Sequence, residues 1–155
     1  MDADSERPPT TAARGDCRAA AEALARFYET LGPASLSRLG EHYAPEARFK
    51  DPFNDVTGLD AIRRVFAHMF ETVDAPRFVV TGLFVQGDEA MLRWDFLLRL
   101  RGRPLTIPGA THLRFDTSGR ATLHRDYWDA AGELYEQVPG LGAAMRWLRR
   151  RLATR

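Results

Sequence analysis

Hydrophobic residues follow a helical period in the first half of the chain. An apolar stripe at spacings of three and four residues predicts a helix that begins near Asp16 and ends at Gly32-Pro33. Ser35, as an N-cap, predicts a short second helix, and a brief extended piece over residues 47–53 follows. The same spacing predicts a third helix over residues 59–73. The apolar positions of the three helices are Leu24, Phe27, Tyr28, Leu31, Leu36, Leu39, Tyr43, Ile62, Val65, Phe66, Met69, Phe70 and Val73.

Beyond Pro76 the period of the hydrophobic residues changes to two, which predicts strands. The expected strands cover residues 77–85, 90–100, 105–115 and 120–128. Gln86-Gly87-Asp88-Glu89 predicts a hairpin between the first two, and Pro108-Gly109 indicates a bulge or an edge position in the third. Helices followed by an antiparallel meander indicate an α+β fold, with the helices packed on one face of a curved sheet.

The composition is typical of one globular domain without an excess of charge. The chain has 155 residues, 45% of them hydrophobic, with 22 basic and 21 acidic side chains. A net charge of +1 provides no basic field, so nucleic acid is not an expected partner. The single cysteine, Cys17, excludes an intramolecular disulfide. No apolar run reaches the roughly 18–20 residues of a membrane span, and the polar start does not resemble a signal peptide, so we expect a cytoplasmic protein.

Three segments are expected along the chain. Residues 1–15 are rich in Pro, Thr, Ala and charge and predict a disordered tail. Residues 16–138 are expected to form the domain, and residues 139–155 a basic C-terminal helix in which Met145, Leu148 and Leu152 make a narrow apolar stripe. The pattern favours a helix that docks on its own domain. The alternative is a helix that contacts a membrane surface or an anionic partner.

Three strand segments place charged side chains on a shared face. The residues that share a face are Phe49 with Asp51, Arg93 with Asp95, and His124 with Asp126. Each pair has a plain structural interpretation, namely a turn before Pro52, a solvated strand face, or an ordinary surface pair. Alternation alone does not say which face lies inside. A metal site is disfavoured, because two ligands at i and i+2 are a weak signal.

Two successive motifs carry a family resemblance. They are Tyr43-Ala44-Pro45-Glu46-Ala47-Arg48-Phe49-Lys50-Asp51-Pro52 and the helix start Gly58-Leu59-Asp60-Ala61-Ile62. Together with the order of elements, they resemble, over about residues 17–138, the nuclear transport factor two-like superfamily, which includes ketosteroid isomerase, scytalone dehydratase, limonene epoxide hydrolase and the SnoaL-like polyketide cyclases. The resemblance implies a cone-shaped α+β fold, in which N-terminal helices pack on a strongly curved mixed, mainly antiparallel sheet that encloses a pocket.

The resemblance to ketosteroid isomerase implies a catalytic base at Asp51, which matches the Asp of a similar Asp-Pro step. The oxyanion-hole tyrosine of that enzyme falls on Phe27, with Tyr28 beside it on another helix face. The protonated aspartate of that enzyme falls on Thr111. Such donors supply the main stabilisation of the transition state, so their replacement argues against this isomerisation.

The resemblance to limonene epoxide hydrolase implies a different catalytic set. Arg93, Asp95 and Asp126 are similar to an Asp–Arg–Asp set of that enzyme, whereas its water-holding Tyr and Asn become Phe49 and Asp51. If the carboxylates face inward, one arginine cannot keep all three ionised, so at least one titrates high. Asp126 would then be the base and Asp95 the acid, or the reverse.

The expected site therefore has a catalytic set and a substrate-binding set. The catalytic set is Asp126, Asp95, Arg93, Asp51 and His124, where His124 would shuttle the proton or bind a substrate oxygen. The residues expected to bind substrate are Phe27, Tyr28, Phe49, Phe66, Leu97, Thr111, Leu113 and Trp128. No cofactor and no metal are expected.

Inward Arg93 and Asp95 would send the apolar side chains of the same strand to the convex face of the sheet. Those side chains are Leu92, Trp94, Phe96 and Leu98. A long exposed apolar strip marks an interaction surface. A homodimer packed through the convex sheet face is therefore expected.

The expected ligand is a small hydrophobic molecule, which is steroid-, polyketide- or terpenoid-like. One hypothesis is acid–base chemistry by a cofactor-independent isomerase, epoxide hydrolase or cyclase. The other is a ligand-binding or interaction module of the same fold that performs no chemistry. Asp95, Arg93 and Asp126 buried and hydrogen-bonded to one another around a void would support catalysis, whereas a pocket filled by Phe and Trp would support the module.

Overall fold

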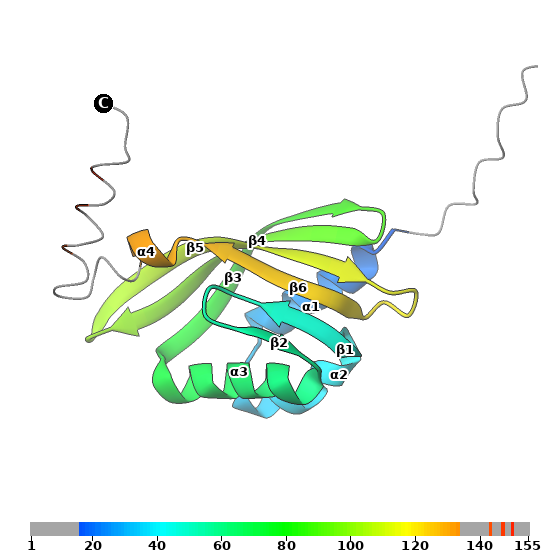
Figure 1. Ribbon diagram of the computed structural model, residues 1–155, viewed down its shortest axis with the longest axis horizontal. Coiled ribbons are helices and arrows are strands. Elements are labelled where there is room, and N and C mark those ends of the chain that lie inside the picture. Colours follow the sequence, from blue (N-terminus) through cyan, green and yellow to red (C-terminus); the bar gives the residue numbers. More distant parts are fainter. Residues whose placement is uncertain (1–15, 134–142, 144–146, 148–149, 151–155) are drawn as a thin grey trace, which may run out of the picture.

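The computed structural model describes residues 16–133 and, beyond them, residues 143, 147 and 150. Figure 1 shows the arrangement of the elements. The helical elements are α1 (Arg18–Glu29), a 3-10 helix (Pro33–Arg38), α2 (Leu39–His42), α3 (Leu59–Thr72) and α4 (Ala130–Glu133). The strands are β1 (Tyr43–Lys50), β2 (Asp55–Thr57), β3 (Asp74–Gln86), β4 (Glu89–Leu100), β5 (Arg103–Phe115) and β6 (Ala121–Trp128).

The strands of the described residues form one open sheet in the order β2-β1-β6-β5-β4-β3. β1 runs parallel to β6, and the other neighbouring strands are antiparallel. Helix α1 contacts β3 and β4, and α3 contacts β1, β2 and β3, so both helices cover the same face of the sheet. The predicted α+β class, with N-terminal helices on one face of a mixed, mainly antiparallel sheet, is confirmed.

Turn and cap residues determine the predicted hairpin and the start of the predicted second helix. The β3–β4 turn contains Gly87 with φ +60, a left-handed conformation that glycine adopts without steric cost. Gly32, rather than Ser35, is the N-cap of the 3-10 helix, and the Ser35 hydroxyl bonds back to the Gly32 amide and carbonyl, each at 2.8 Å. Tyr43, which was expected on the second helix, begins β1 instead.

The core lies between the helices and the concave face of the sheet. Its fully buried residues include Leu24, Leu39, Ile62, Leu92 and Leu113, and each such side chain stabilises the fold by about 1.5–3 kcal/mol. The alternation in β4 settles which face of that strand is inside, because Leu92 is 1% and Trp94 5% exposed.

The expected convex strip is therefore wrong. Leu92, Trp94, Phe96 and Leu98 lie on the face of β4 that meets the core, where Phe96 stacks on Phe78 with ring centroids 4.6 Å apart. The physical reason is that burying the apolar face against the helices removes it from water, whereas the opposite placement would bury an arginine and an aspartate.

Pro108 takes the edge position rather than a bulge. The pairing of β5 with β4 runs through Pro108 without a shift in register. Pairing of β5 with β6 begins only at Gly109, so the preceding residues of β5 pair on one side. A proline without an amide hydrogen is tolerated at such an edge.

Parts of the expected organisation lie outside the described residues. These are the tail over residues 1–15 and, apart from residues 143, 147 and 150, the C-terminal helix over residues 139–155 with Met145, Leu148 and Leu152. Within the described part, no helix has the length and apolar character needed to cross a membrane.

Candidate functional site

A narrow interior cavity lies between the sheet and the helices. Most of its lining is apolar and one side is polar. The apolar residues are Phe66, Phe78, Val80, Leu92 and Trp94, and the polar ones are Tyr28, Thr111, His124 and Asp126. The cavity volume is about 20 Å³, which is room for about one water molecule. A ligand of about one ring therefore enters only if the lining side chains move.

Strand register brings the polar side chains together. Thr111 of β5 pairs with Leu92 of β4 and with Asp126 of β6, and successive residues of a strand point to opposite faces. The inward position of Leu92 therefore places Thr111 and Asp126 inward as well. His124 lies two residues before Asp126 on the same strand face.

A continuous chain of hydrogen bonds runs along the polar side of the cavity. Trp94 Nε1 donates to Thr111 Oγ1 at 2.8 Å, and Thr111 Oγ1 donates to Asp126 Oδ1 at 2.5 Å. His124 Nε2 lies 2.8 Å from the same carboxylate oxygen. Both of these contacts end on Oδ1 of a partly buried side chain, and the hydrogen bonds of the described residues do not use Oδ2.

Two tyrosines cover the other ring nitrogen of His124. Tyr28 Oη lies 3.0 Å and Tyr43 Oη 2.9 Å from His124 Nδ1, and the two hydroxyls also bond to each other. The Phe49 ring stacks on the imidazole with centroids 4.4 Å apart. His124 is 2% exposed, so its ring is held at both nitrogens and on one face.

Burial determines the protonation state of the tyrosine pair. Loss of hydration raises the pKa of Tyr28 well above its usual value, and neighbouring Tyr43 and the charge of Asp126 raise it further. Burial likewise raises the pKa of Tyr43, with a smaller contribution from Asp126, against the lowering effect of its bond to Tyr28. Both side chains therefore carry a hydroxyl hydrogen at neutral pH.

These raised pKa values predict a loss of stability in alkaline solution. Tyrosine in an unfolded chain has a pKa of about 10. The stabilisation by the neutral hydroxyls is complete below that pH and is lost as the pH rises above it towards the folded-state pKa. We expect the melting temperature to fall steeply above about pH 10. Tyr28→Phe should weaken this dependence, and Tyr127→Phe, at an exposed tyrosine, should leave it unchanged. A wild-type melting temperature that is constant between about pH 9 and 11 would contradict the prediction.

Arg93 and Asp95 lie on the opposite face of β4 from the cavity. The exposed Arg93 guanidinium donates to the hydroxyl and the carbonyl oxygen of Thr81, both at 3.2 Å. Neither Arg93 nor Asp95 lines the cavity that Asp126 lines. The expected grouping of Arg93 and Asp95 with Asp126 is therefore wrong, because Trp94 and its apolar neighbours take the inward positions of β4.

Asp51 has the role of a turn residue. Its Oδ1 accepts from the backbone amides of Phe53 at 2.7 Å and Asn54 at 2.6 Å, and the Asn54 side-chain amide bonds both carboxylate oxygens. Asp51 lies outside the interior cavity and lines an open groove at the end of β6, which Asp126 and Trp128 also line. Its match to a catalytic base is not supported by this placement.

The residues expected to bind substrate are divided between the cavity and its surroundings. Those that line the cavity are Tyr28, Phe66 and Thr111. Phe49 packs behind His124, and Trp128 lines the outer groove. The remaining three lie elsewhere. Phe27 packs at a tilt against His42 with centroids 4.5 Å apart, Leu113 is buried in the core, and Leu97 is on the outward face of β4.

Sequence patterns missed two members of the hydrogen-bonded chain. Tyr43 fitted a helical stripe, and its contact with His124 arises only from the pairing of β1 with β6. Trp94 lies inside with Leu92, an orientation that the alternation in its strand leaves open. Tyr28, rather than its neighbour Phe27, brings its side chain to the cavity.

The chemistry of the cavity differs from that of a two-carboxylate site. Within the described residues, Asp126 is the single carboxylate that lines it. The same part of the chain has no group of three or more His, Cys, Asp or Glu side chains placed to hold a metal ion. The arrangement offers one base and several hydroxyl or imidazole groups, which suits proton transfer.

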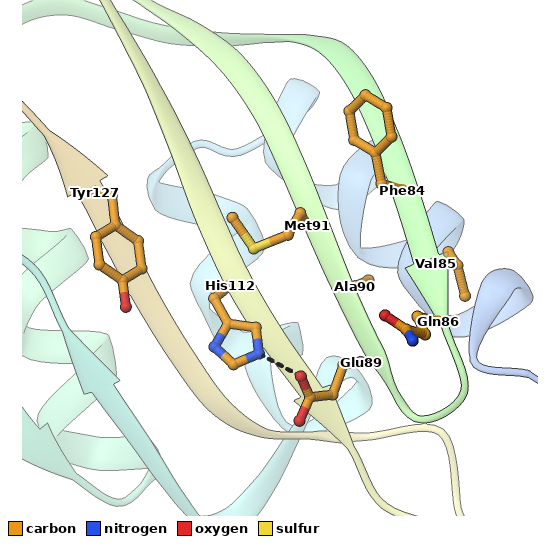
Figure 2. A pocket seen from close by; sticks show the side chains of 8 residues that line it. All are labelled: Phe84, Val85, Gln86, Glu89, Ala90, Met91, His112 and Tyr127. Carbon is orange, nitrogen blue, oxygen red and sulfur yellow. Dashed lines mark hydrogen bonds and ion pairs between the residues drawn. The ribbon is translucent and has the colours of Figure 1, made fainter.

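A second, open groove lies on the convex face of the sheet. Its lining residues are Phe84, Val85, Gln86, Glu89, Ala90, Met91, His112 and Tyr127. Figure 2 shows His112 bonded to Glu89, at 3.0 Å, among the apolar side chains. Three of these are exposed, with Phe84 at 60%, Met91 at 37% and Tyr127 at 48%. Arg114 and, less strongly, His112 hold the pKa of Glu89 below its usual value.

The homodimer through the convex face stays a prediction, and it now rests on other residues. An aspartate in place of Met91 would put an unpaired charge in the apolar part of this groove. We expect Met91→Asp to reduce the mass measured by sedimentation at micromolar concentration from dimer to monomer. Arg64→Glu, an exposed charge reversal on α3, is the control. A wild-type chain that sediments as a monomer would rule the dimer out.

The fold and the polar cluster together define a small α+β domain with an interior cavity that the hydrogen-bonded His124 and Asp126 line. The model of the SnoaL-like domain matches residues 24–124, more than half of the chain. The chain therefore belongs to the SnoaL-like domain family. Among curated proteins, none matches it.

Solved structures agree on the fold. A hypothetical protein with a ketosteroid isomerase-like fold from Catenulispora acidiphila, in complex with trimethylamine, has a TM-score of 0.63 and 21% identity, covering 74% of this chain and 88% of its own. An LEH-like epoxide hydrolase from M. tuberculosis has a TM-score of 0.63 and 16% identity, covering 85% and 96%. TsrD from Streptomyces laurentii has a TM-score of 0.62 and 22% identity, covering 81% and 94%.

Proposed function

We propose that the chain binds a small carbonyl compound of about one ring in the interior cavity and transfers a proton on it, with Asp126 as the general base. The observation that carries this proposal is the hydrogen-bonded chain at Asp126. Thr111 and His124 both bond to Oδ1, which leaves Oδ2 for the ligand. The cavity volume of about 20 Å³ requires the lining side chains to move before a ring can enter, which favours a single ring over a fused steroid.

Each polar residue has a role in the proposed reaction. Asp126 Oδ2 takes the proton from the carbon next to the carbonyl group. The electron pair of the broken C–H bond forms a carbon–carbon double bond, and the carbonyl electrons move to its oxygen. The Tyr28 hydroxyl donates a hydrogen bond to this oxygen, where negative charge develops. In a β,γ-unsaturated ketone, the proton returns from Asp126 to the γ-carbon while the carbonyl group re-forms, which completes an isomerisation to the conjugated enone.

A second candidate function is ligand binding without chemistry. The observation that favours it is the aromatic filling of the cavity, where Phe78 packs edge-on against Trp94 with centroids 5.5 Å apart and Phe66 lies near Tyr28. A ligand would then displace these rings and be held by hydrophobic contact.

Deuterium exchange distinguishes the two candidates. A panel of cyclic ketones and enones is incubated with the protein in deuterated buffer, and NMR follows the loss of hydrogen next to the carbonyl group. Quenching of tryptophan fluorescence measures binding of the same compounds. Exchange faster than in buffer supports the enzyme, and binding without exchange supports the module. Absence of both binding and exchange across the panel would contradict the proposal.

A further inference from the structure

The direction of the buried hydrogen bonds can be worked out from Trp94. An indole nitrogen can only donate a hydrogen bond, so Thr111 Oγ1 accepts at its 2.8 Å contact with Trp94. The Thr111 hydroxyl has one hydrogen, and its 2.5 Å contact with Asp126 Oδ1 uses it. Asp126 Oδ1 is therefore an acceptor in this bond.

The acceptor role of Oδ1 determines where Asp126 can bind a proton. In a protonated carboxyl group one oxygen carries the hydrogen and the other retains the better acceptor capacity. Since Thr111 donates to Oδ1, a proton on Asp126 belongs on Oδ2. The second contact of Oδ1, with His124 Nε2 at 2.8 Å, then needs its hydrogen from the imidazole. This holds whether the carboxyl group is charged or neutral.

The same reasoning continues to the tyrosine pair. With a hydrogen on Nε2 and none on Nδ1, His124 presents Nδ1 as an acceptor, and both tyrosine hydroxyls lie within 3.0 Å of it. Tyr43 is fully buried, whereas Tyr28 lines the cavity. When Tyr43 donates to Nδ1, the Tyr28 hydrogen is available to Tyr43 or to a ligand oxygen. No buried side-chain nitrogen or oxygen of the described residues lacks a partner, so the chain of bonds is complete.

We propose that Thr111 and Trp94 are positioning residues for Asp126. They confine proton exchange of the carboxyl group to Oδ2, and through Oδ1 they hold His124 in the tautomer with hydrogen on Nε2. This inference rests on the proposed function for its effect on rate, while the tautomer is a property of the protein alone. The two can therefore fail separately.

The test compares variants of the hydrogen bonds at Thr111. The hydroxyl of this residue both accepts from Trp94 and donates to Asp126. Thr111→Val removes the hydroxyl at nearly the same size, Thr111→Ser retains it, and Trp94→Phe removes only the indole donor and part of the ring. Nitrogen-15 NMR of the imidazole reports the tautomer, with the His124 signal identified by its loss in His124→Asn. Deuterium exchange of the best ketone reports the rate, and thermal melting reports folding.

We expect wild type and Thr111→Ser to show hydrogen on Nε2 of His124. Thr111→Val should show the other tautomer in a measurable share of molecules and exchange the ketone about tenfold more slowly or worse. Trp94→Phe should shift both readouts in the same direction but less, because the Thr111 hydroxyl can then rotate. If Thr111→Val does not fold, Trp94→Phe is the variant that tests the inference.

Two results would overturn the inference. One is hydrogen on Nδ1 of His124 in the wild-type protein. The other is a folded Thr111→Val, or in its place Trp94→Phe, with an unchanged tautomer. If the wild type instead shows the expected tautomer but exchanges none of the ketones, the proposed function fails while the hydrogen-bond direction stands.

Discussion

Asp126→Asn is expected to slow ketone deuterium exchange by about 10²–10⁴-fold, the usual contribution of a positioned general base. The amide oxygen of asparagine can still accept at the Oδ1 position from Thr111 and His124. The fold should therefore be retained while the atom that takes the proton is lost. Exchange rates at saturating ketone, together with melting temperatures, measure the two effects separately.

Asp95→Asn is the matched control for that variant. Asp95 was expected in the pocket by family resemblance, but it lies on the outward face of β4 and does not line the cavity. We expect the exchange rate of Asp95→Asn to be close to that of wild type. An Asp126→Asn protein that binds and exchanges the ketone as fast as wild type would remove Asp126 as the base. A large loss of exchange rate in Asp95→Asn would instead mean that Asp95 takes part in the reaction.

Gly109→Ala adds a single methyl group and is expected to lower the free energy of unfolding. A Cβ atom at Gly109 would overlap the six-membered ring of Trp94, which pairs with it across β4 and β5. The ring of Trp94 is 5% exposed and bonded to Thr111, so it cannot move without breaking that bond. Overpacking of this kind costs about 1–3 kcal/mol or more, which chemical denaturation would measure.

A second mutation tests whether Trp94 is the cause. In a Trp94→Phe background the overlapping ring atoms are absent, so Gly109→Ala should destabilise the protein much less than in wild type. Gly40→Ala is the control, because its added methyl group would meet only the Leu59 side chain, at 3.5 Å. Additive effects of the Gly109 and Trp94 changes would contradict this account of the glycine.

Most elements of the fold could be predicted because their signals are local. The apolar period of α3, the glycine in the β3–β4 turn and the alternation of the four long strands depend on neighbours within a few residues. The starting residues of α2 and β1 were less predictable, since Tyr43 satisfied a helical stripe and a strand equally well. In the fold, pairing of β1 with β6 draws Tyr43 into the sheet.

The candidate site was predicted in part. Asp126, His124, Thr111, Tyr28 and Phe66 line the cavity, and their roles in a reaction stay predictions. The prediction of inward Arg93 and Asp95 is wrong. The alternation in β4 leaves both orientations open, and the packing of the helices on the sheet buries the face with Leu92 and Trp94. For this strand, the cost of burying charge was a better guide than resemblance at low identity.

Local order in the chain thus determined the elements, the fold class and the composition of each strand face. Assembly of the sheet decided which of those faces became the cavity and which residues meet there. Tyr28, Tyr43, Thr111 and His124 come from separate elements and gather around Asp126 only when α1 packs on the sheet and β6 lies between β1 and β5. The physical reason is that hydrogen-bond partners in this cluster are selected by strand register and helix packing, which act between residues far apart in the sequence.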